Sequence, residues 1–234
     1  MQDEKGCMLH PASCILYLAF EMRSFSSIAP IILAAGDSTR MGYPKALLPI
    51  GNDIFITHIL RLAQKVGLAS PTIILGRAAG IIQPAIQNWP AAIRINPDPD
   101  RGQLSSIQLG LSSLNANAQA GMIWPVDHPA VSEDLVASLA ELFIQSKSLI
   151  AFPKCGDKRG HPAIFHRALF QEFMDAPLGE GPKSILVRHQ QDTAELRTDE
   201  SAAVEDIDTQ SDYESLIGES VESALTRKNN NPAD

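Results

Sequence analysis

Residues 30–49, PIILAAGDSTRMGYPKALLP, contain a short apolar run that opens into a glycine-containing loop. The run over residues 31–35 ends at Gly36, and its length and apolar composition predict a buried parallel strand. The loop carries two spaced cations, Arg40 and Lys45. Small residues let backbone N–H groups approach phosphate oxygens closely, while arginine offers a fork of donors and lysine a mobile point charge. We therefore expect an α/β fold whose first loop binds a triphosphate.

Neither of the common phosphate-binding glycine motifs occurs in this loop. The Walker pattern GxxxxGK[ST] is absent, and Gly36 and Gly42 stand too far apart for GxGxxG. The loop instead has the order G-x-x-x-R-x-G-x-x-K after Leu-Ala-Ala. An ordinary strand-to-loop turn with a surface arginine and lysine is the alternative interpretation of this stretch taken alone.

Composition limits the class of protein. The chain has 234 residues, of which 44% are hydrophobic and 20% charged, as expected for one large α/β domain or two small ones. A formal net charge of −8 argues against a general nucleic-acid binder.

The three cysteines, Cys7, Cys14 and Cys155, form neither a metal-binding spacing nor an even disulfide set, which indicates a reducing, cytoplasmic compartment. The apolar run at residues 14–20 is too short for a membrane span, so we expect no membrane partner.

The two ends of the chain differ from its middle. Residues 1–29 are expected to form an N-terminal extension, possibly disordered, although packing on the domain as an extra element is the alternative. A single domain is expected over residues 30–225. The polar residues 226–234 are expected to be a frayed tail.

Helical and strand patterns alternate after the loop. Apolar spacing predicts a helix over residues 55–66 that stops at Gly67, whereas a helix over residues 81–87 is interrupted by Pro84. The remaining expected elements are strands at residues 71–75, 92–95, 121–126 and 148–152, and helices at residues 104–114 and after Ser132. This alternation predicts a three-layer, Rossmann-like α/β fold with a mainly parallel (mixed) sheet.

Asp127 is the best candidate for a metal ligand. It follows the expected strand at residues 121–126 and stands between Pro125 and Pro129. Open parallel sheets bind ligands beyond the carboxyl ends of their strands, so Asp127 and the glycine loop should face one cleft. Mg²⁺ (or Mn²⁺) needs only one or two protein carboxylates beside substrate phosphates. An aspartate that caps a turn is the alternative, and His128 is expected to point its ring toward solvent.

The segments taken together resemble the MobA-like nucleotidyltransferases, a group that contains the molybdenum cofactor cytidylyl- and guanylyltransferases. The chain is most similar to the cytidylyl members. Five elements occur in family order: the glycine loop, Gly-x-x-Ser-Ser at residues 102–106, Val-Asp-x-Pro at 126–129, Gly-His-Pro at 160–162 and Asp-Ile-Asp-Thr at 206–209. The resemblance covers about residues 30–217. Departures from the family pattern occur at Asp37, at Gln210 and Ser211, and in the N-terminal extension.

The resemblance implies a nucleotide site and a catalytic set. The implied nucleotide-binding residues are Leu33, Ala34, Ala35, Gly36, Ser38, Arg40, Lys45, Gly102 and Ser105. The implied catalytic residues are Arg40, Lys45 and Asp127. A second metal-binding carboxylate could be Asp206 or Asp208, and the sequence does not decide between them because alternate strand residues face opposite ways. Since Arg197 is the one base in the acidic stretch at residues 192–222, a solvated acidic face is the alternative.

The acceptor side is implied by two further segments. Gly160 and His161 belong to the Gly-His-Pro element, and Lys183 lies at an expected helix start where it could meet a second phosphate. A structural histidine that fixes the turn is the alternative for His161.

The implied reaction is attack of an acceptor phosphate on the α-phosphorus of an NTP, with release of pyrophosphate. Molybdopterin or its molybdenum form is the acceptor that the resemblance favours. CTP is favoured over GTP because cytidylyl members tend to have Leu-Ala-Ala-Gly, as at residues 33–36. The alternatives are another phosphorylated acceptor, such as an isoprenoid or sugar phosphate, and a non-catalytic carrier that delivers the cofactor to a molybdoenzyme.

Overall fold

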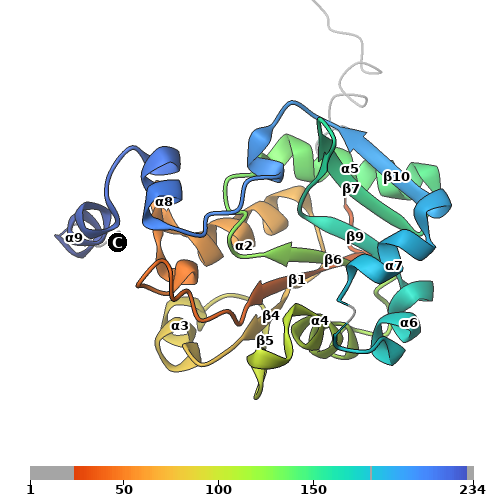
Figure 1. The fold of residues 1–234 in the computed structure, drawn as a ribbon, viewed down its shortest axis with the longest axis horizontal. Helices are drawn as coiled ribbons and strands as arrows, with labels where there is room; N and C mark the ends of the chain where they lie inside the picture. Colours follow the sequence, from red (N-terminus) through yellow and green to blue (C-terminus); the bar gives the residue numbers. More distant parts are fainter. Residues whose placement is uncertain (1–23, 180, 231–234) are drawn as a thin grey trace, which may run out of the picture.

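The computed structural model describes residues 24–179 and 181–230 (Figure 1). An eight-stranded sheet runs through the middle, in the order β10-β7-β9-β6-β1-β4-β5, with β8 paired to β7. Its strands are β1 (Ile28–Ala34), β4 (Thr72–Leu75), β5 (Ala92–Ile95), β6 (Ala120–Pro125), β7 (Ile150–Cys155), β8 (Lys158–Arg159), β9 (Ala163–His166) and β10 (Thr193–Arg197). Only the pairings made by β8 and β9 are antiparallel among the described strands of this sheet. The expected mainly parallel sheet is confirmed.

Helices cover both faces of the sheet. One face is covered by α2 (Phe55–Val66), α3 (Ala79–Ile86) and α5 (Glu133–Ser146), and the hydrophobic cluster on this side extends to α8 (Gln210–Ile217) and α9 (Val221–Asn230), which pack on each other beyond the edge of the sheet (Figure 1). The other face is covered by α4 (Gln103–Ser112), α6 (Phe170–Asp175) and α7 (Lys183–Arg188). Within β1, Ile32 packs into the first layer and Ile31 into the second, so both faces of the strand are buried. This explains why its sequence is a continuous apolar run.

Short elements connect these layers. They are the small hairpin β2 (Pro49–Ile50) and β3 (Asp53–Ile54), and the 3₁₀ turns η1 (Lys45–Leu47), η2 (Pro99–Arg101), η3 (Arg167–Leu169), η4 (Gln190–Asp192) and η5 (Ser201–Ala203). In the described part of the chain, no helix is both long and apolar enough to cross a membrane.

The carboxyl ends of the three central strands lie level with one another. Ala34 of β1 pairs with Leu75 of β4, and Leu33 pairs with Pro125 of β6. At Gly76, directly after β4, an added Cβ would lie 2.2 Å from the carbonyl oxygen of Ala35. The absence of a side chain at Gly76 therefore allows two loops to leave the same edge of the sheet in close contact.

The boundaries of the domain differ from those expected. Phe25 is buried and donates its N–H to the carbonyl of Gly67 at 2.9 Å, and Ile28 already belongs to β1. The domain therefore includes residues before position 30, whereas the rest of the expected extension, residues 1–23, lies outside the described residues. At the other end, α9 continues to Asn230, and Arg227 pairs with Glu219 at 2.6 Å. The expected frayed tail is thus helical as far as residue 230.

Two local predictions are wrong. Pro84 was expected to interrupt the helix at residues 81–87, but α3 includes this proline. The expected strand at residues 206–209 is an extended segment without strand pairing. It is fixed by one main-chain hydrogen bond, from the N–H of Ile207 to the carbonyl of Asp127 at 2.9 Å, and by the capping box of Thr209 and Asp212 at the start of α8.

Candidate active site

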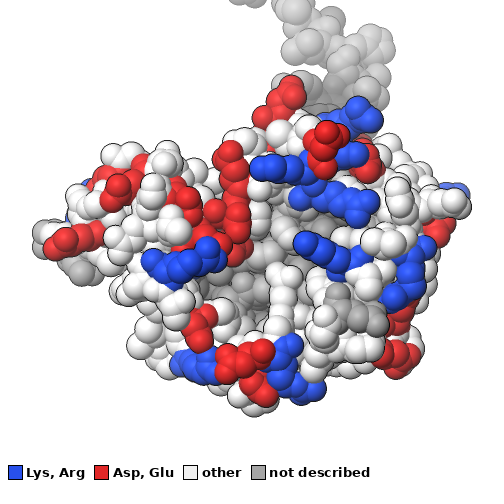
Figure 2. Space-filling view, in the orientation of Figure 1, with Lys and Arg blue, Asp and Glu red and all other residues white. Residues whose placement is uncertain are grey.

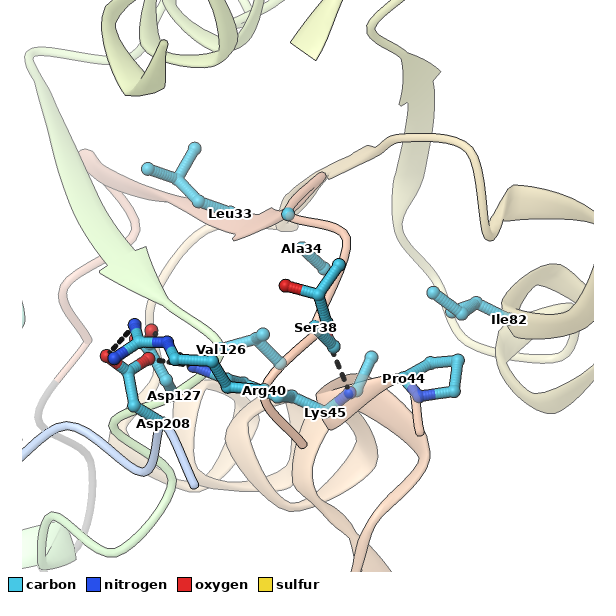
Figure 3. A pocket seen from close by; sticks show the side chains of 13 residues that line it. Leu33, Ala34, Ser38, Arg40, Pro44, Lys45, Ile82, Val126, Asp127 and Asp208 are labelled. Carbon is cyan, nitrogen blue, oxygen red and sulfur yellow. Dashed lines mark hydrogen bonds and ion pairs between the residues drawn. The ribbon is translucent and has the colours of Figure 1, made fainter. Parts of the chain in front are cut away.

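A polar pocket of about 280 Å³ lies beyond the carboxyl ends of β1 and β6, and we name it the loop pocket (Figure 3). Eight of the residues expected at the site line it: Leu33, Ala34, Gly36, Ser38, Arg40, Lys45, Asp127 and Asp208. The surface is hollowed near the centre of the face shown in Figure 2, where acidic and basic side chains both border the depression. Segments far apart in the sequence therefore converge as expected.

Backbone geometry fixes the glycine loop. The carbonyl of Ser38 accepts hydrogen bonds from the N–H groups of Met41 and Gly42, both at 3.1 Å. Its hydroxyl accepts a third from the N–H of Lys45, also at 3.1 Å. Ser38 and Gly42 have positive φ values of 54° and 75°, so the chain turns sharply at both residues. This conformation of the glycine loop places Lys45 at the start of η1, beside the loop pocket.

The C-terminal part of the chain closes one side of the pocket. Gln210 donates its side-chain amide to the carbonyl of Met41 at 3.1 Å, and the buried hydroxyl of Tyr213 donates to the carbonyl of Pro49 at 2.8 Å. Together with the bond from Ile207 to Asp127, these contacts hold Asp208 over the glycine loop.

Two cations and two carboxylates form the charged part of the loop pocket (Figure 3). The Nζ of Lys45 donates to Asp127 Oδ2 at 3.3 Å and also to Asp208 Oδ1. The Nη2 of Arg40 donates to the other oxygen of Asp208. Burial alone would raise the pKa of Asp208, but the hydrogen bonds and charges of Lys45 and Arg40 outweigh it, so the pKa lies below its usual value.

The donors in this pocket fit a hard divalent cation. Asp127 Oδ1 is buried and has no hydrogen-bond partner among the described residues, with His128 Nε2 4.0 Å away, so this oxygen is available as a ligand. Asp208 lies near Asp127, and the ammonium group of Lys45 contacts both carboxylates. No group of three or more histidines, cysteines or acids suited to a metal occurs in residues 24–179 and 181–230. One or two carboxylates completed by phosphate oxygens is the ligand set typical of Mg²⁺.

Asp206 does not share this position. It lines a separate groove of about 640 Å³ together with Glu205, Asp212 and Lys158, which we name the acidic groove. The prediction that Asp206 could reach the metal beside Asp127 is therefore not supported by its placement, and Asp208 is the carboxylate that the structure brings to the loop pocket.

A second hollow of about 240 Å³ adjoins the loop pocket, and we name it the helix pocket. The two share Leu33, Gly36 and Asp127. The helix pocket is completed by Ala35, Pro99, Gly102, Gln103, Ser106 and Pro125. Gly102 has a φ of 89°, and this left-handed conformation turns the chain into α4 at the pocket wall.

Ser105 was expected to contact the nucleotide, but Ser106 is the serine that lines the helix pocket. The hydroxyl of Ser105 donates to the carbonyl of Gly102 at 2.8 Å. Asn96 donates to the hydroxyls of both serines at 2.9 Å. Ser105 therefore supports the wall of the helix pocket without lining it. The Ser-Ser pair in the sequence was compatible with either serine as the residue that lines the pocket.

A third hollow, of about 300 Å³, contains the three residues expected on the acceptor side, Gly160, His161 and Lys183. We name it the outer cavity. Its apolar wall includes Phe152 and Phe165. Arg159 also lines it, with its guanidinium carbon 5.2 Å from the centre of the Phe152 ring.

Neither Arg159 nor Lys183 has an acidic partner among the described residues. Arg159 was missed, although a cation directly before Gly-His-Pro could have indicated it.

A pair of histidines lies behind Asp127. His128 is buried, and its ring centre lies 4.9 Å from that of His161, so the expectation of a solvent-facing ring is wrong. The reason is that Trp124 donates its indole N–H to the carbonyl of His128 at 3.0 Å and holds the turn inward. Burial, with a contribution from the neighbouring His128, lowers the pKa of His161 to about 4. His161 is therefore neutral near pH 7.

Asp37, where the chain departs from the family pattern, is part of an exposed ion-pair bridge. Arg77 donates to Asp37 and to Asp100, each at 2.5 Å. The bridge joins the glycine loop to η2 beside the helix pocket.

Known proteins resemble this chain in sequence and in fold. Residues 30–193 match the MobA-like NTP transferase domain. A probable molybdenum cofactor guanylyltransferase of Mycobacterium ulcerans (strain Agy99) is 28% identical over 194 residues, which cover 80% of this chain and 91% of that protein. The crystal structure of Rv0371c from Mycobacterium tuberculosis H37Rv has a TM-score of 0.73 at 25% identity, covering 85% of this chain and all of that one.

A manganese complex of Rv0371c is also similar, with a TM-score of 0.69 at 25% identity over 82% of this chain and 98% of that chain. The family match includes the glycine loop, Asp127 and the Gly-His-Pro element, and it extends over well more than half of the sequence. The chain therefore belongs to the MobA-like NTP transferase family and is a nucleotidyltransferase.

Proposed function

We propose that the protein transfers the cytidylyl group of CTP to the phosphate of a molybdopterin-type acceptor and releases pyrophosphate. The observation that carries the proposal is the continuity of the three hollows. Asp127 lines both the loop pocket and the helix pocket, and Gln103 lines both the helix pocket and the outer cavity. A nucleotide in the first two and an acceptor in the third would have their phosphates adjacent.

The chain's own residues suit this chemistry. An oxygen of the acceptor phosphate forms a bond to the α-phosphorus, and the bond from the α-phosphorus to the oxygen that bridges to the β-phosphate breaks. The electron pair leaves with pyrophosphate. Lys45 and Arg40 would hold the triphosphate and stabilise the charge that moves onto pyrophosphate. Such a transfer depends on positioning and charge and needs no covalent nucleophile.

Asp127 and Asp208 are the residues that would hold a divalent cation, Mg²⁺ or Mn²⁺. The ion, when bound, would supply positive charge that offsets the negative charge of the phosphates. The buried Oδ1 of Asp127, which accepts no hydrogen bond from the described residues, supports this assignment. Rv0371c, a protein of similar structure, forms a complex with manganese, which is a divalent ion.

The outer cavity supports an acceptor that is both flat and phosphorylated. Arg159 and Lys183 supply positive charge at its wall and have no acidic partner among the described residues, whereas the rest of the wall is mainly apolar and includes the exposed Val187. The flat face of a pterin can cover such a wall, whereas a sugar phosphate would leave it in contact with water. Gly160 and the neutral His161 complete the wall, and His161 would act as a hydrogen-bond partner of the acceptor.

CTP and GTP remain separate candidates for the nucleotide. The name of the similar mycobacterial protein favours GTP. We favour CTP because Ala35 lines the helix pocket, and its methyl group narrows the space beside the backbone where a larger ring system would lie. The product would be a cytosine dinucleotide cofactor for a molybdoenzyme, made in the cytoplasm.

Pyrophosphate release tests the proposal. The protein is mixed with each of the four NTPs, Mg²⁺ and molybdopterin, and release is measured with and without the acceptor. We expect acceptor-dependent release that is fastest with CTP. Tight acceptor binding without pyrophosphate release from any NTP would instead indicate a carrier. Release that requires an isoprenoid or sugar phosphate would reassign the acceptor.

A further inference from the structure

An ion-pair bridge joins three loops at the carboxyl edge of the sheet. Arg77, in the loop after β4, donates from Nη1 to Asp37 and from Nη2 to Asp100, each at 2.5 Å. Asp37 lies in the glycine loop after β1, and Asp100 lies in η2 after β5. Since β4 lies between β1 and β5 in the sheet, one guanidinium reaches the loops on both sides of its own.

The bridge ends beside the helix pocket on both sides. Asp37 directly follows Gly36, and Asp100 directly follows Pro99. Both Gly36 and Pro99 line the helix pocket. A guanidinium is planar and presents its donors as a rigid fork, so the two carboxylates that it binds are held at a fixed separation. The bridge therefore ties together two segments of the pocket wall.

The backbone beside Arg77 is fixed by close packing. An added Cβ on Gly76 would lie 2.2 Å from the carbonyl oxygen of Ala35, so the loop after β4 lies directly against another residue of the helix pocket. The carbonyl of Gly76 also accepts a hydrogen bond from the N–H of Ala79 at 3.0 Å, at the start of α3. Among the residues that the structure describes, Arg77 is the one hydrogen-bond partner of the Asp37 side chain. Arg77 is therefore the fixed member of the pair, and Asp37 is the member that it holds in place.

We propose that Arg77 is a positioning residue that sets the width of the helix pocket and so contributes to the choice of the nucleotide base. This inference rests on the proposed placement of the nucleotide in the loop and helix pockets. Arg77 acts through the residues beside Asp37 and Asp100, because it lines neither pocket itself. Loss of the bridge would let the glycine loop move away from η2. The wider pocket would then favour the larger ring system of a purine over that of a pyrimidine.

The relative affinity for CTP and GTP tests the role of Arg77. Both nucleotides carry the same triphosphate, so the ratio of their Kd values, measured by calorimetry with Mg²⁺, cancels any general effect of charge on phosphate binding. Arg77→Gln should shift this ratio toward GTP by about threefold to tenfold, because exposed ion pairs supply only a modest free energy. Asp37→Asn and Asp100→Asn should shift it in the same direction. Arg77→Lys should shift it less, because an ammonium group can still bind one of the two carboxylates.

Ionic strength provides a second measurement. The Arg77 side chain is 53% exposed, and exposed ion pairs weaken as the salt concentration rises. The Kd ratio of the unmodified protein should therefore shift toward GTP between about 0.1 M and about 1 M KCl. The ratio of Arg77→Gln should stay constant over the same range, because this variant has no bridge to lose.

Arg61→Gln is the matched control. The Arg61 side chain is 51% exposed on α2 and binds the carboxylate of Asp53 at 2.7 and 2.9 Å, but it lines none of the three hollows. This variant should keep the Kd ratio of the unmodified protein at both salt concentrations. An equal shift in Arg61→Gln and Arg77→Gln would overturn the role of Arg77, because loss of any surface arginine would then have the same effect. Thermal melts of all variants check that the fold is intact.

The other outcomes separate this inference from the proposed function. An unchanged Kd ratio in Arg77→Gln would overturn the role of Arg77 alone. Equal weakening of both nucleotides in Arg77→Gln, with tighter binding of both in Asp37→Asn, would also overturn it, because Arg77 would then bind the phosphates directly. Binding of neither nucleotide by the unmodified protein would overturn the proposed function together with this role. Preference of the unmodified protein for GTP, with the same shift in Arg77→Gln, would overturn the cytidylyl assignment and support the role of Arg77.

Discussion

The ammonium group of Lys45 lies 3.3 Å from the carboxylate of Asp127, although 82 residues separate the two in the chain. Only 11% of the Lys45 side chain and 26% of the Asp127 side chain are exposed. The pair therefore differs from a surface ion pair, which contributes only about 0–1 kcal/mol to stability. It connects the glycine loop after β1 to the turn after β6, the two segments that the proposed reaction would require side by side.

Asp127→Asn should abolish metal-dependent turnover and leave the fold intact. The amide has nearly the same shape but carries no negative charge for a hard cation. Pyrophosphate release over a Mg²⁺ titration is the measurement, with Asp134→Asn, an exposed aspartate on α5, as the control. Wild-type rates in saturating Mg²⁺ would show that the metal assignment is wrong.

Lys45→Ala should lower kcat/KM for the NTP by far more than the loss of a surface charge. A lost contact to transition-state charge costs roughly 2.7–4 kcal/mol, by analogy with the loss of an oxyanion donor. Lys65→Ala is the control, because Lys65 on α2 makes an exposed pair with Glu133 at 3.4 Å. A decrease in kcat/KM smaller than about tenfold, roughly 1.4 kcal/mol, would show that Lys45 acts as an ordinary surface lysine.

Asp208→Asn and Asp206→Asn form a matched pair that tests which carboxylate serves the metal. Asp208 lines the loop pocket and Asp206 the acidic groove, so only Asp208→Asn should raise the Mg²⁺ concentration needed for half-maximal turnover. The same Mg²⁺ dependence for both variants would remove Asp208 from the metal site, and a larger effect at Asp206 would reverse the assignment.

Arg159→Ala should raise the KM for molybdopterin with little change in the KM for CTP. Arg159 lines the outer cavity, whereas its neighbour Lys158 lines the acidic groove. Lys158→Ala therefore removes an equal charge from the same strand and serves as the control. Steady-state kinetics with each substrate varied in turn is the measurement. Equal effects of the two substitutions would mean that general charge, and not the cavity, attracts the acceptor.

Ala35→Gly should weaken the preference for CTP over GTP without reversing it. One methylene in a pocket discriminates by only about 1–3 kcal/mol, so the segment that contains Gly102 and Ser106 must share the task. The ratio of kcat/KM for the two nucleotides, measured in both proteins, tests this. If the unmodified protein uses GTP as well as CTP or better, the cytidylyl assignment is wrong, while the nucleotidyltransferase assignment stands.

The sequence predicted the part of the site that depends on local patterns. The strand at residues 31–35 and the position of Asp127 at a strand end are short-range features, and parallel pairing of β1 with β6 brings their ends together. Gly160, His161 and Lys183 could be assigned to one hollow only through resemblance, because contacts between their segments are long-range.

The features that were missed depend on tertiary contacts. The choice between Asp206 and Asp208 assumed strand alternation, but the segment is fixed by the bond from Ile207 to Asp127. Strand β10, TAELR, has no apolar run because it is an edge strand in which no residue is fully buried. His128 is held inward by an indole four residues earlier in the chain, a contact that no periodicity reveals.

The return of the C-terminal segment to the glycine loop sets the order in which the protein can become active during synthesis. Chains emerge from the ribosome with the N-terminal part first. Arg40, Lys45 and Asp127 are made early, but Asp208 and the anchors Gln210 and Tyr213 come after the family-matched residues 30–193. A nascent chain that stops at residue 193 would have the glycine loop without its acidic cover, so activity should appear only after residues 208–213 have been synthesised.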